Sequence, residues 1–221
     1  MIQVKNLSQS YRKKKVLENV NFTIGKNELC ALVGRNGAGK STLIHSMLGI
    51  LPVKNGSVHL NGISLHKKDW KKHVAYLPEK FQLYTHLTGL ENMKFFASLE
   101  RSKIEETKIE QALRSVGLWE EREQMISEYS KGMLQRLGLA VMLYYDSEIL
   151  ILDEPTSGLD PIGRIEVLNI LKSLENKTIL LSSHHLDEIQ KVCTHVAYLE
   201  NGMITKYTTE EFTTRMTNGG N

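Results

Sequence analysis

The sequence predicts an α/β fold built on a parallel core sheet. An apolar strand at 29–33 leads into a glycine-rich loop, and the residues after the loop have the apolar spacing of a helix. Further strand segments at 148–152 and 178–181 alternate with helical segments at about 162–174 and 186–193. Such alternation favours parallel pairing, because each helix returns the chain to the same end of the sheet.

Three β-hairpins add antiparallel structure to this core. Residues 2–24 form the first, with its turn near Lys13–Lys15, and residues 57–64 form the second, around Asn61-Gly62. Residues 196–204 form the last hairpin, and a short strand at 73–78 ends at a proline. The first two hairpins predict an N-terminal antiparallel β subdomain.

Residues 88–145 are predicted to be mostly helical. Thr88 and Glu91 have the spacing of a capping box, and the apolar residues that follow lie on one helical face. A second helix is expected at 103–116. This stretch therefore looks like a helical subdomain inserted into the α/β core.

The chain is expected to form a single domain over residues 1–221. The core and the β subdomain would take about 1–84 and 147–221, and the helical insert about 85–146. The tail from Thr213 to Asn221 is polar and ends in glycines, so we expect it to fray.

Composition places the chain in the cytosol and assigns no membrane span to it. The 221 residues are 41% hydrophobic and carry a net charge of +3, which suits an ordinary core and indicates little about partners. The basic run Arg12–Lys15 is typical of a solvated turn. Cys30 and Cys193 form no C-x-x-C motif, and neither a leader nor an apolar run of the ~20 residues that cross a membrane is visible.

The loop at 34–41 carries the first chemical signal. It reads Gly34, Arg35, Asn36, Gly37, Ala38, Gly39, Lys40 and Ser41, which fits the phosphate-binding pattern G-x-x-x-x-G-K-[ST]. Backbone N–H groups of the loop and of Thr42 would cradle the phosphates of ATP at a helix N-terminus. Lys40 would reach the β- and γ-phosphates, and the Ser41 hydroxyl would hold Mg²⁺.

Two acids end the strand at 148–152. Phosphate loops pair with a strand-end aspartate that binds Mg²⁺, and this role goes to Asp153. Glu154 would point to the other side of the strand by alternation and could act as the general base that polarises the attacking water.

The segment Tyr129–Leu137 makes the pattern specific. Ser130 can cap a helix, and Ser130, Lys131, Gly132 and Met133 resemble the signature motif of ATP-binding-cassette (ABC) ATPases, usually L-S-G-G-Q. Together with the phosphate loop and the two strand-end acids, this segment makes the chain resemble an ABC nucleotide-binding subunit over essentially all 221 residues. The resemblance implies a phosphate-loop NTPase core of the RecA type.

The resemblance also implies roles for further residues. Tyr11 matches the aromatic residue that stacks on adenine, although a tyrosine near a hairpin also packs locally. Glu79 ends the loop that senses Mg²⁺ and the permease, and residues 156–160 match the loop that crosses a dimer interface. His184, rather than His185, matches the switch histidine that contacts the γ-phosphate.

Two motifs depart from the usual family pattern. Lys131 and Met133 stand where the family usually has Gly and Gln, and Glu79 replaces the usual Gln. Both departures resemble the bacterial exporters of drugs, peptides and lipids. A carboxylate at 79 remains a competent Mg²⁺ ligand.

The family arrangement implies two protein partners. The signature segment completes the site of a second ATP-binding subunit, and a homodimer is sufficient because one chain carries every motif. An integral-membrane permease would dock on the helical insert at the cytoplasmic face of the membrane. Nucleic acid is not an expected partner. Candidate docking residues, for which core packing is an equal alternative, are Phe81, Leu83, Tyr84 and Phe95.

Other readings of the motifs stay open at this point. A soluble ABC protein of the ribosome usually has two cassettes, and chromosome-type ATPases have a long coiled coil that is not visible here. A small kinase would not need the signature segment and His184 together. An importer subunit is the remaining alternative within the transporters.

Overall fold

The structure, a computed structural model, describes residues 1–12, 14–100 and 103–218. The chain divides into two units. The first consists of Met1–Ala75, Glu148–Glu154 and Glu175–Asn221, and the second of Tyr76–Ser147 and Pro155–Leu174. The insert expected at 85–146 therefore lies within the second unit, which also takes in residues 155–174.

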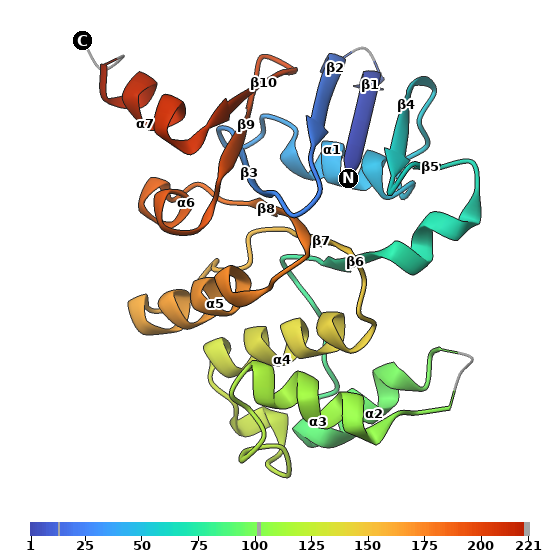
Figure 1. Cartoon of the computed structure of the whole chain (residues 1–221), viewed down its shortest axis with the longest axis vertical. Helices are drawn as coiled ribbons and strands as arrows, with labels where there is room; N and C mark the ends of the chain where they lie inside the picture. The colour runs from blue at the N-terminus through green and yellow to red at the C-terminus, as the bar shows by residue number, and fades with distance from the viewer. Residues whose placement is uncertain (13, 101–102, 219–221) are drawn as a thin grey trace. The chain divides into compact units, whose positions relative to one another are not determined.

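An antiparallel sheet forms one part of the first unit. Its strand order is β2-β1-β4-β5, where β1 is Ile2–Tyr11, β2 Lys14–Ile24, β4 Asn55–Leu60 and β5 Ile63–Ser64. Figure 1 shows β1, β2 and β4 side by side. The hairpin predicted at 57–64 is present. The turn predicted near Lys13–Lys15 is wrong for Lys14 and Lys15, which pair with β1 as part of β2, and Lys13 lies outside the described residues.

A six-stranded sheet carries the parallel core in the order β10-β9-β3-β8-β7-β6. Here β3 spans Leu29–Val33, β6 Val74–Leu77, β7 Ile149–Leu152, β8 Thr178–Ser182, β9 His195–Glu200 and β10 Met203–Thr208. Strands β9, β3, β8 and β7 are parallel, and every residue of β3, β7 and β8 is buried. This confirms the predicted α/β fold, since near-continuous apolar strands are typical of parallel sheets covered on both faces.

The register of the parallel strands brings their carboxyl ends together. Leu32 lies opposite Ser182, and Leu152 lies opposite Leu181. The segments that follow β3, β7 and β8 therefore leave the sheet at one edge, where ligands bind in open α/β sheets.

The helices of the first unit are α1 (Lys40–Met47), α6 (Leu186–Val192) and α7 (Thr209–Asn218), with a 3₁₀ segment η1 at Lys68–His73. The expectation that the tail frays from Thr213 is wrong for the described part, because α7 continues to Asn218. Phe212 anchors α7: its side chain is 1% exposed and its ring lies 5.5 Å from Tyr198 and 6.1 Å from Tyr207. Gly219, Gly220 and Asn221 lie outside the described residues.

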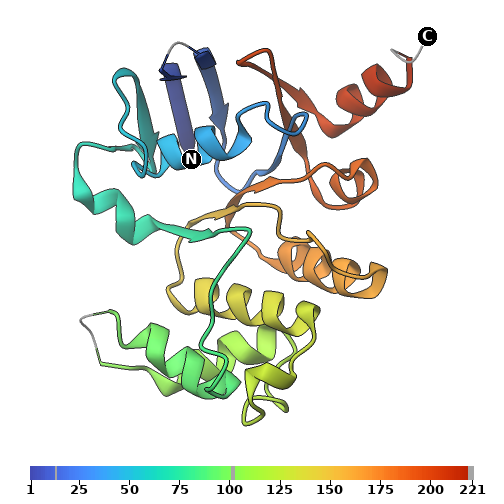
Figure 2. The ribbon, with the colours of Figure 1, turned by 180° about the vertical axis from the view of Figure 1, so that it is seen from behind.

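The second unit is helical. It contains α2 (Gly89–Ala97), α3 (Glu106–Ser115), α4 (Lys131–Tyr144), α5 (Pro161–Ser173) and the 3₁₀ segment η2 (Ile126–Glu128). Figure 2 shows α2, α3 and α4 gathered together. The predicted caps at Thr88 and Ser130 are present, and Asp160 caps α5: each of the three side chains accepts a backbone N–H of the helix that follows.

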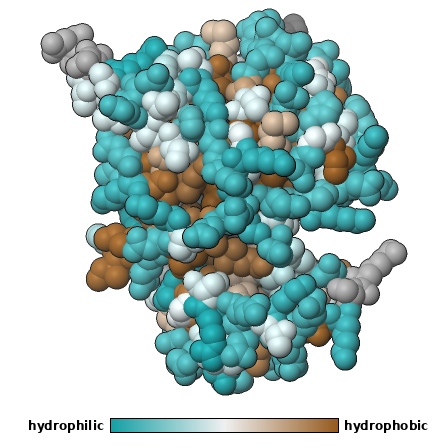
Figure 3. Space-filling view, in the orientation of Figure 1, coloured by the Kyte–Doolittle hydropathy of each residue, from teal (hydrophilic) through white to brown (hydrophobic). Residues whose placement is uncertain are grey.

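None of the helices in the described residues is long and apolar enough to cross a membrane. The face seen in Figure 3 is mostly hydrophilic, with smaller groups of hydrophobic residues. Among the large exposed apolar side chains, Ile162 is 70% and Ile165 is 51% exposed at the start of α5.

Asn92 should be a main support of the second unit. It is fully buried and makes three bonds to backbone: Oδ1 accepts the Tyr84 N–H at 2.9 Å, and Nδ2 donates to Tyr84 O at 3.1 Å and Thr88 O at 2.9 Å. We expect Asn92→Ala to lower the free energy of unfolding by about 2–3 kcal/mol, because these groups lose their partner inside the protein. Urea unfolding of the full chain measures this. Thr88→Ala, which removes only a cap, should cost about 1 kcal/mol, and an equal or smaller loss for Asn92→Ala would contradict the expectation.

Candidate functional site

The loop between β3 and α1 is tightly enclosed on two sides. A Cβ on Gly34 would lie 2.6 Å from the carbonyl oxygen of Leu199, and one on Gly39 would lie 2.8 Å from Cγ1 of Val16. Gly39 also has a φ of +109°, which disfavours any side chain. Burial raises the pKa of the Cys30 thiol, in the strand before the loop, to about 12, so this cysteine is a packing residue.

Lys40 begins α1 and turns its ammonium back into the loop. Only 8% of the residue is exposed, and Nζ donates to the carbonyl oxygen of Gly34 at 2.9 Å. The same Nζ lies 3.6 Å from Oε1 of Glu154. The next residue, Ser41, is exposed in the first turn of the helix. A buried cation beside open backbone N–H groups is suited to bind the oxygens of a phosphate.

Ser182 joins the two acids at the end of β7. Its hydroxyl donates to Oδ1 of Asp153 at 2.7 Å and accepts the backbone N–H of Glu154 at 2.7 Å. Strand alternation does not orient Glu154 as the sequence analysis expected, because β7 ends at Leu152 and Glu154 has a φ of +48°. A left-handed glutamate is uncommon, and such strained backbone gathers at functional sites.

The carboxylate of Glu154 lies between two nitrogen groups. Oε2 is 2.9 Å from Nδ1 of His184, while Oε1 is the atom near Lys40. The Glu154 side chain is 14% exposed and the His184 side chain 51% exposed. A carboxylate fixed in this way, at the exposed edge of a buried strand, can accept a proton from a water molecule.

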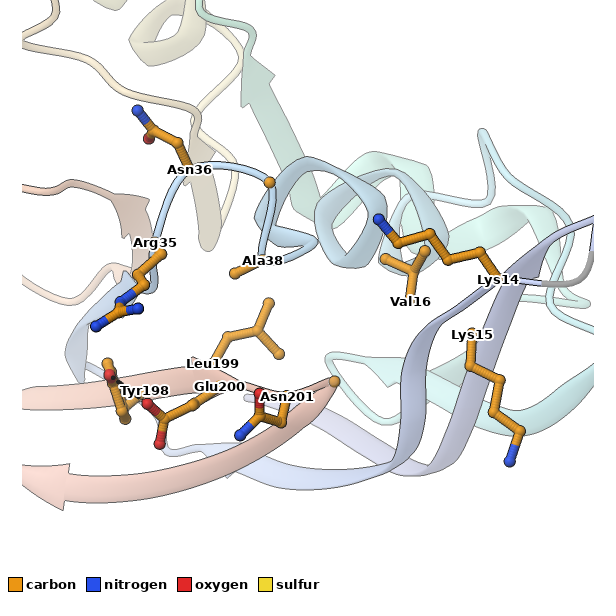
Figure 4. Close-up of a pocket in the computed structure, with 12 residues that line it drawn as sticks. Lys14, Lys15, Val16, Arg35, Asn36, Ala38, Tyr198, Leu199, Glu200 and Asn201 are labelled. Atoms are coloured by element: carbon orange, nitrogen blue, oxygen red, sulfur yellow. Dashed lines mark hydrogen bonds between the residues drawn. The ribbon is translucent and has the colours of Figure 1, made fainter.

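A cavity of about 480 Å³ borders the first half of the loop. Figure 4 shows Arg35, Asn36 and Ala38 of the loop on one side and the hairpin residues Tyr198 to Asn201 on the other. Lys14, Lys15 and Val16 of β2 complete the walls. Tyr11, which is 52% exposed, is not a lining residue, and neither are Lys40, Asp153, Glu154 or His184.

The second unit holds the remaining predicted residues. Ser130 caps α4, with Oγ accepting the N–H of Met133 at 3.2 Å. Asp160 caps α5 through the N–H of Gly163 at 2.7 Å. Glu79, Lys131 and Ser157 line one cavity of about 400 Å³.

Three of the four residues expected to dock a permease, Phe81, Tyr84 and Phe95, belong to an aromatic cluster. The Tyr84 ring lies 4.4 Å from that of Phe95, and Phe81 lies 5.2 Å from Phe96. Tyr84 is 40% exposed, whereas Phe81, Leu83 and Phe95 are half-buried. Phe96 belongs to the same cluster.

The structure thus gathers the loop, Asp153, Glu154 and His184 within the first unit. Sequence reasoning missed Ser182, whose hydroxyl holds both acids. Its signal is a serine at the last position of an otherwise apolar buried strand, where a polar side chain needs a partner.

A family model described as ABC transporter matches residues 17–157. The matched region includes the phosphate loop, the signature segment and both strand-end acids.

Curated relatives match along most of the chain. The uncharacterized ABC transporter ATP-binding protein YhcH of Bacillus subtilis is 36% identical over 92% of this chain and 68% of its own length. The lantibiotic transport ATP-binding protein SrtF of Streptococcus pyogenes is 37% identical over 92% of this chain and 89% of its own length. The bacitracin transport ATP-binding protein BcrA of Enterococcus faecalis is 36% identical over 91% and 67%.

Solved structures agree in fold. A structure titled as the ATP binding subunit of an ABC transporter has a TM-score of 0.84 at 31% identity, covering 99% of this chain and 93% of that one. The ADP conformation of MJ1267, an ATP-binding cassette, has a TM-score of 0.89 at 21% identity over 100% and 95%, which is a likeness of fold alone.

Removing the Ser182 hydroxyl should disturb both acids. We expect Ser182→Ala to lower the free energy of unfolding by about 1–3 kcal/mol, because the N–H of Glu154 and one oxygen of Asp153 lose a buried partner. ATP hydrolysis should fall with it. Ser173→Ala is the control, since that exposed hydroxyl bonds only Ile170 O within α5. Thermal unfolding and phosphate release measure both effects, and a Ser182→Ala protein as stable and active as the control would refute the role of this hydroxyl.

Proposed function

The chain belongs to the ABC transporter family, and we propose that it energises an exporter as one of two ATP-hydrolysing subunits bound to a membrane permease. ABC ATP-binding domains are ATPases, so the chain is the ATP-binding, ATP-hydrolysing component of such a transporter. The single observation that carries the mechanism is the carboxylate of Glu154, bonded to His184 and close to Lys40.

Residues 34–42 bind the triphosphate of ATP in this proposal. The backbone N–H groups from Gly34 to Thr42 donate to phosphate oxygens, and Lys40 supplies a positive charge at the β- and γ-phosphates. Tyr11, exposed at the end of β1, stacks on the adenine.

The oxygen donors of the site fit Mg²⁺. Oδ1 of Asp153 is bonded to Ser182, which leaves its second oxygen for a cation, and the Ser41 hydroxyl is exposed. Mg²⁺ prefers one or two such ligands together with substrate phosphates, and Glu79 is the further ligand that the resemblance suggests. The bound ion would neutralise charge on the phosphate oxygens.

Glu154 acts as the general base and His184 as its positioning partner. Oε2 of Glu154 takes a proton from the attacking water, and Nδ1 of His184 holds the carboxylate in place. Nζ of Lys40 lies 3.6 Å from Oε1 of Glu154, so the lysine that contacts the γ-phosphate is also next to the proposed base.

Two subunits sandwich two ATP molecules. Ser130 to Met133 of one subunit complete the site of the other, where the Ser130 hydroxyl and the N–H of Gly132 donate to the γ-phosphate. Hydrolysis removes these contacts and the sandwich opens, because the open and closed states then differ less in binding energy. The second subunit is another copy of this chain.

The membrane partner is a permease, bound at the cytoplasmic face through the aromatic cluster of Phe81, Tyr84, Phe95 and Phe96. Relatives are named for lantibiotic transport, bacitracin transport and linearmycin resistance, and these names favour an exporter. Half-exposed aromatic rings such as Tyr84 are suited to anchor a partner helix. Nucleic acid is not a partner in this proposal.

Glu154→Gln should keep ATP binding and slow hydrolysis by about 10²–10⁴-fold, the usual contribution of a general base. The amide keeps the shape of the side chain but accepts no proton. ATP binding by calorimetry and phosphate release under saturating ATP measure the two steps. Glu120→Gln, at an exposed position far along the chain, should retain wild-type turnover.

The same variant also tests the sandwich, because slow hydrolysis traps the ATP-bound state. Light scattering should report a dimer of Glu154→Gln with ATP and a monomer without it. A monomer at saturating ATP would exclude the homodimer, and near-normal turnover would exclude Glu154 as the base.

The docking proposal predicts that a polytopic membrane protein co-purifies with the tagged chain from its own cells in mild detergent. Tyr84→Ala should reduce its recovery severalfold without affecting ATP binding, since one exposed anchor is lost. Ile50→Ala, at an apolar side chain 58% exposed in the first unit, is the matched control. Mass spectrometry of the eluate identifies the partner, and recovery with ribosomes alone would contradict the transporter assignment.

A further inference from the structure

Two of the three residues that depart from the usual family pattern line the same cavity. Glu79 and Lys131 are separated by 51 residues of sequence and both face the space of about 400 Å³ in the second unit. One replaces a neutral amide with a negative charge, and the other replaces a glycine with a positive charge. Two changes of opposite sign that face one cavity compensate each other electrostatically.

Neither Glu79 nor Lys131 forms an ion pair within 4.0 Å, with the other or with any further group, in the described part of the chain. Both side chains are exposed, and no oppositely charged group lies within 4.0 Å of either among residues 1–12, 14–100 and 103–218. Lys80, which also lines the cavity, is exposed as well. Each of the two charges is therefore available to the other.

The walls of the cavity strengthen such an attraction. Phe81, Leu134 and Leu159 are apolar lining residues, and apolar walls lower the effective dielectric between charges. The Lys131 ammonium lies next to the exposed turn at Ser157 and Gly158: a Cβ on Gly158 would be 3.9 Å from its Nζ. Lys131 thus connects the start of α4 with the loop at 156–160.

We propose that Glu79 and Lys131 are a positioning pair whose mutual attraction holds the loop at 76–79 in register with the start of α4. The pair acts through neighbouring residues: Glu79 fixes the loop, and Lys131 fixes the segment that begins with Ser130. Its effect on turnover rests on the proposed function, because those two segments are the ones assigned to Mg²⁺ and to the partner's γ-phosphate.

A charge pair predicts non-additive substitutions. Removing one charge leaves the other without its partner, whereas removing both leaves the net charge of the cavity wall unchanged, because Lys80 remains in either case. Exposed or half-exposed pairs are worth about 1.5- to 5-fold in an equilibrium or rate constant. The effect should weaken with salt, since screening acts on exposed charges.

The test is a double-mutant cycle on the full chain with Glu79→Gln, Lys131→Met and the double variant. We expect each single variant to lower kcat for ATP hydrolysis about two- to fivefold with little change in KM, and the double variant to lose less than the product of the two single losses. The coupling should shrink at 1 M salt. The variant with exchanged charges, Glu79→Lys with Lys131→Glu, should have a higher kcat than either single charge reversal.

Lys172→Met is the matched control for the lost lysine, because Lys172 is exposed on α5 and does not line the cavity. Combined with Glu79→Gln it should give additive effects. Additive effects of Glu79→Gln and Lys131→Met on kcat would refute the charge pair. A coupling between the two substitutions that does not change with salt concentration would refute it too.

The outcome separates the pair from the proposed function. The loss of kcat in Glu79→Gln could be restored by excess Mg²⁺ and be unaffected by adding Lys131→Met. That result would refute the pair, because Glu79 would then act only as a metal ligand. If the wild-type chain hydrolysed no ATP, the proposed function would fail by itself. The same cycle read from urea unfolding midpoints would still show whether the two charges couple.

Discussion

The parallel register of β3, β8 and β7 is the constraint on which the candidate site depends. Pairing Leu32 with Ser182 and Leu152 with Leu181 brings three strand ends to one edge. A slip of one residue would turn the side chains of a strand to the opposite face, which fully buried strands resist. Ser182 then reaches both acids, so the catalytic geometry follows from backbone pairing that lies well below the surface.

The glycine loop is fixed by a second constraint, the close approach of two neighbours. The β9–β10 hairpin lies against Gly34 through Leu199, and β2 lies against Gly39 through Val16. The hairpin and β2 also bond to each other, since the N–H of Glu18 donates to Gly202 O at 2.7 Å. A loop held on both sides keeps its N–H groups aimed without rearranging when phosphate binds, which is the benefit of preorganisation.

Local signals predicted most of the elements because their causes are local. The caps at Thr88, Ser130 and Asp160, the glycine loop and the apolar strands each depend on a few adjacent residues. What the sequence did not reveal depends on distant contacts. The role of Ser182 needs the β7–β8 register, and the left-handed turn at Glu154 replaces the strand alternation that seemed to orient it.

Tertiary packing also explains the structure of two longer segments that the sequence did not predict correctly. The polar α7 is helical to Asn218 because one residue, Phe212, packs against the tyrosines of β9 and β10, and a helix needs such burial more than propensity. Residues 155–174 group with the helical unit rather than with the sheet. The amino-acid composition does not mark this boundary. The assigned roles of the site residues stay predictions until the variants are measured.

The burial of both cysteines makes the chain a clean background for spectroscopic labels. Cys30 and Cys193 are buried, and burial raises the pKa of each thiol, so maleimide or spin-label reagents find little thiolate there. A single cysteine introduced at an exposed position would consequently take up the probe selectively in the otherwise native chain. Opening and closing of two such labelled copies could then be followed as a change in the distance between their probes, without first removing the natural thiols.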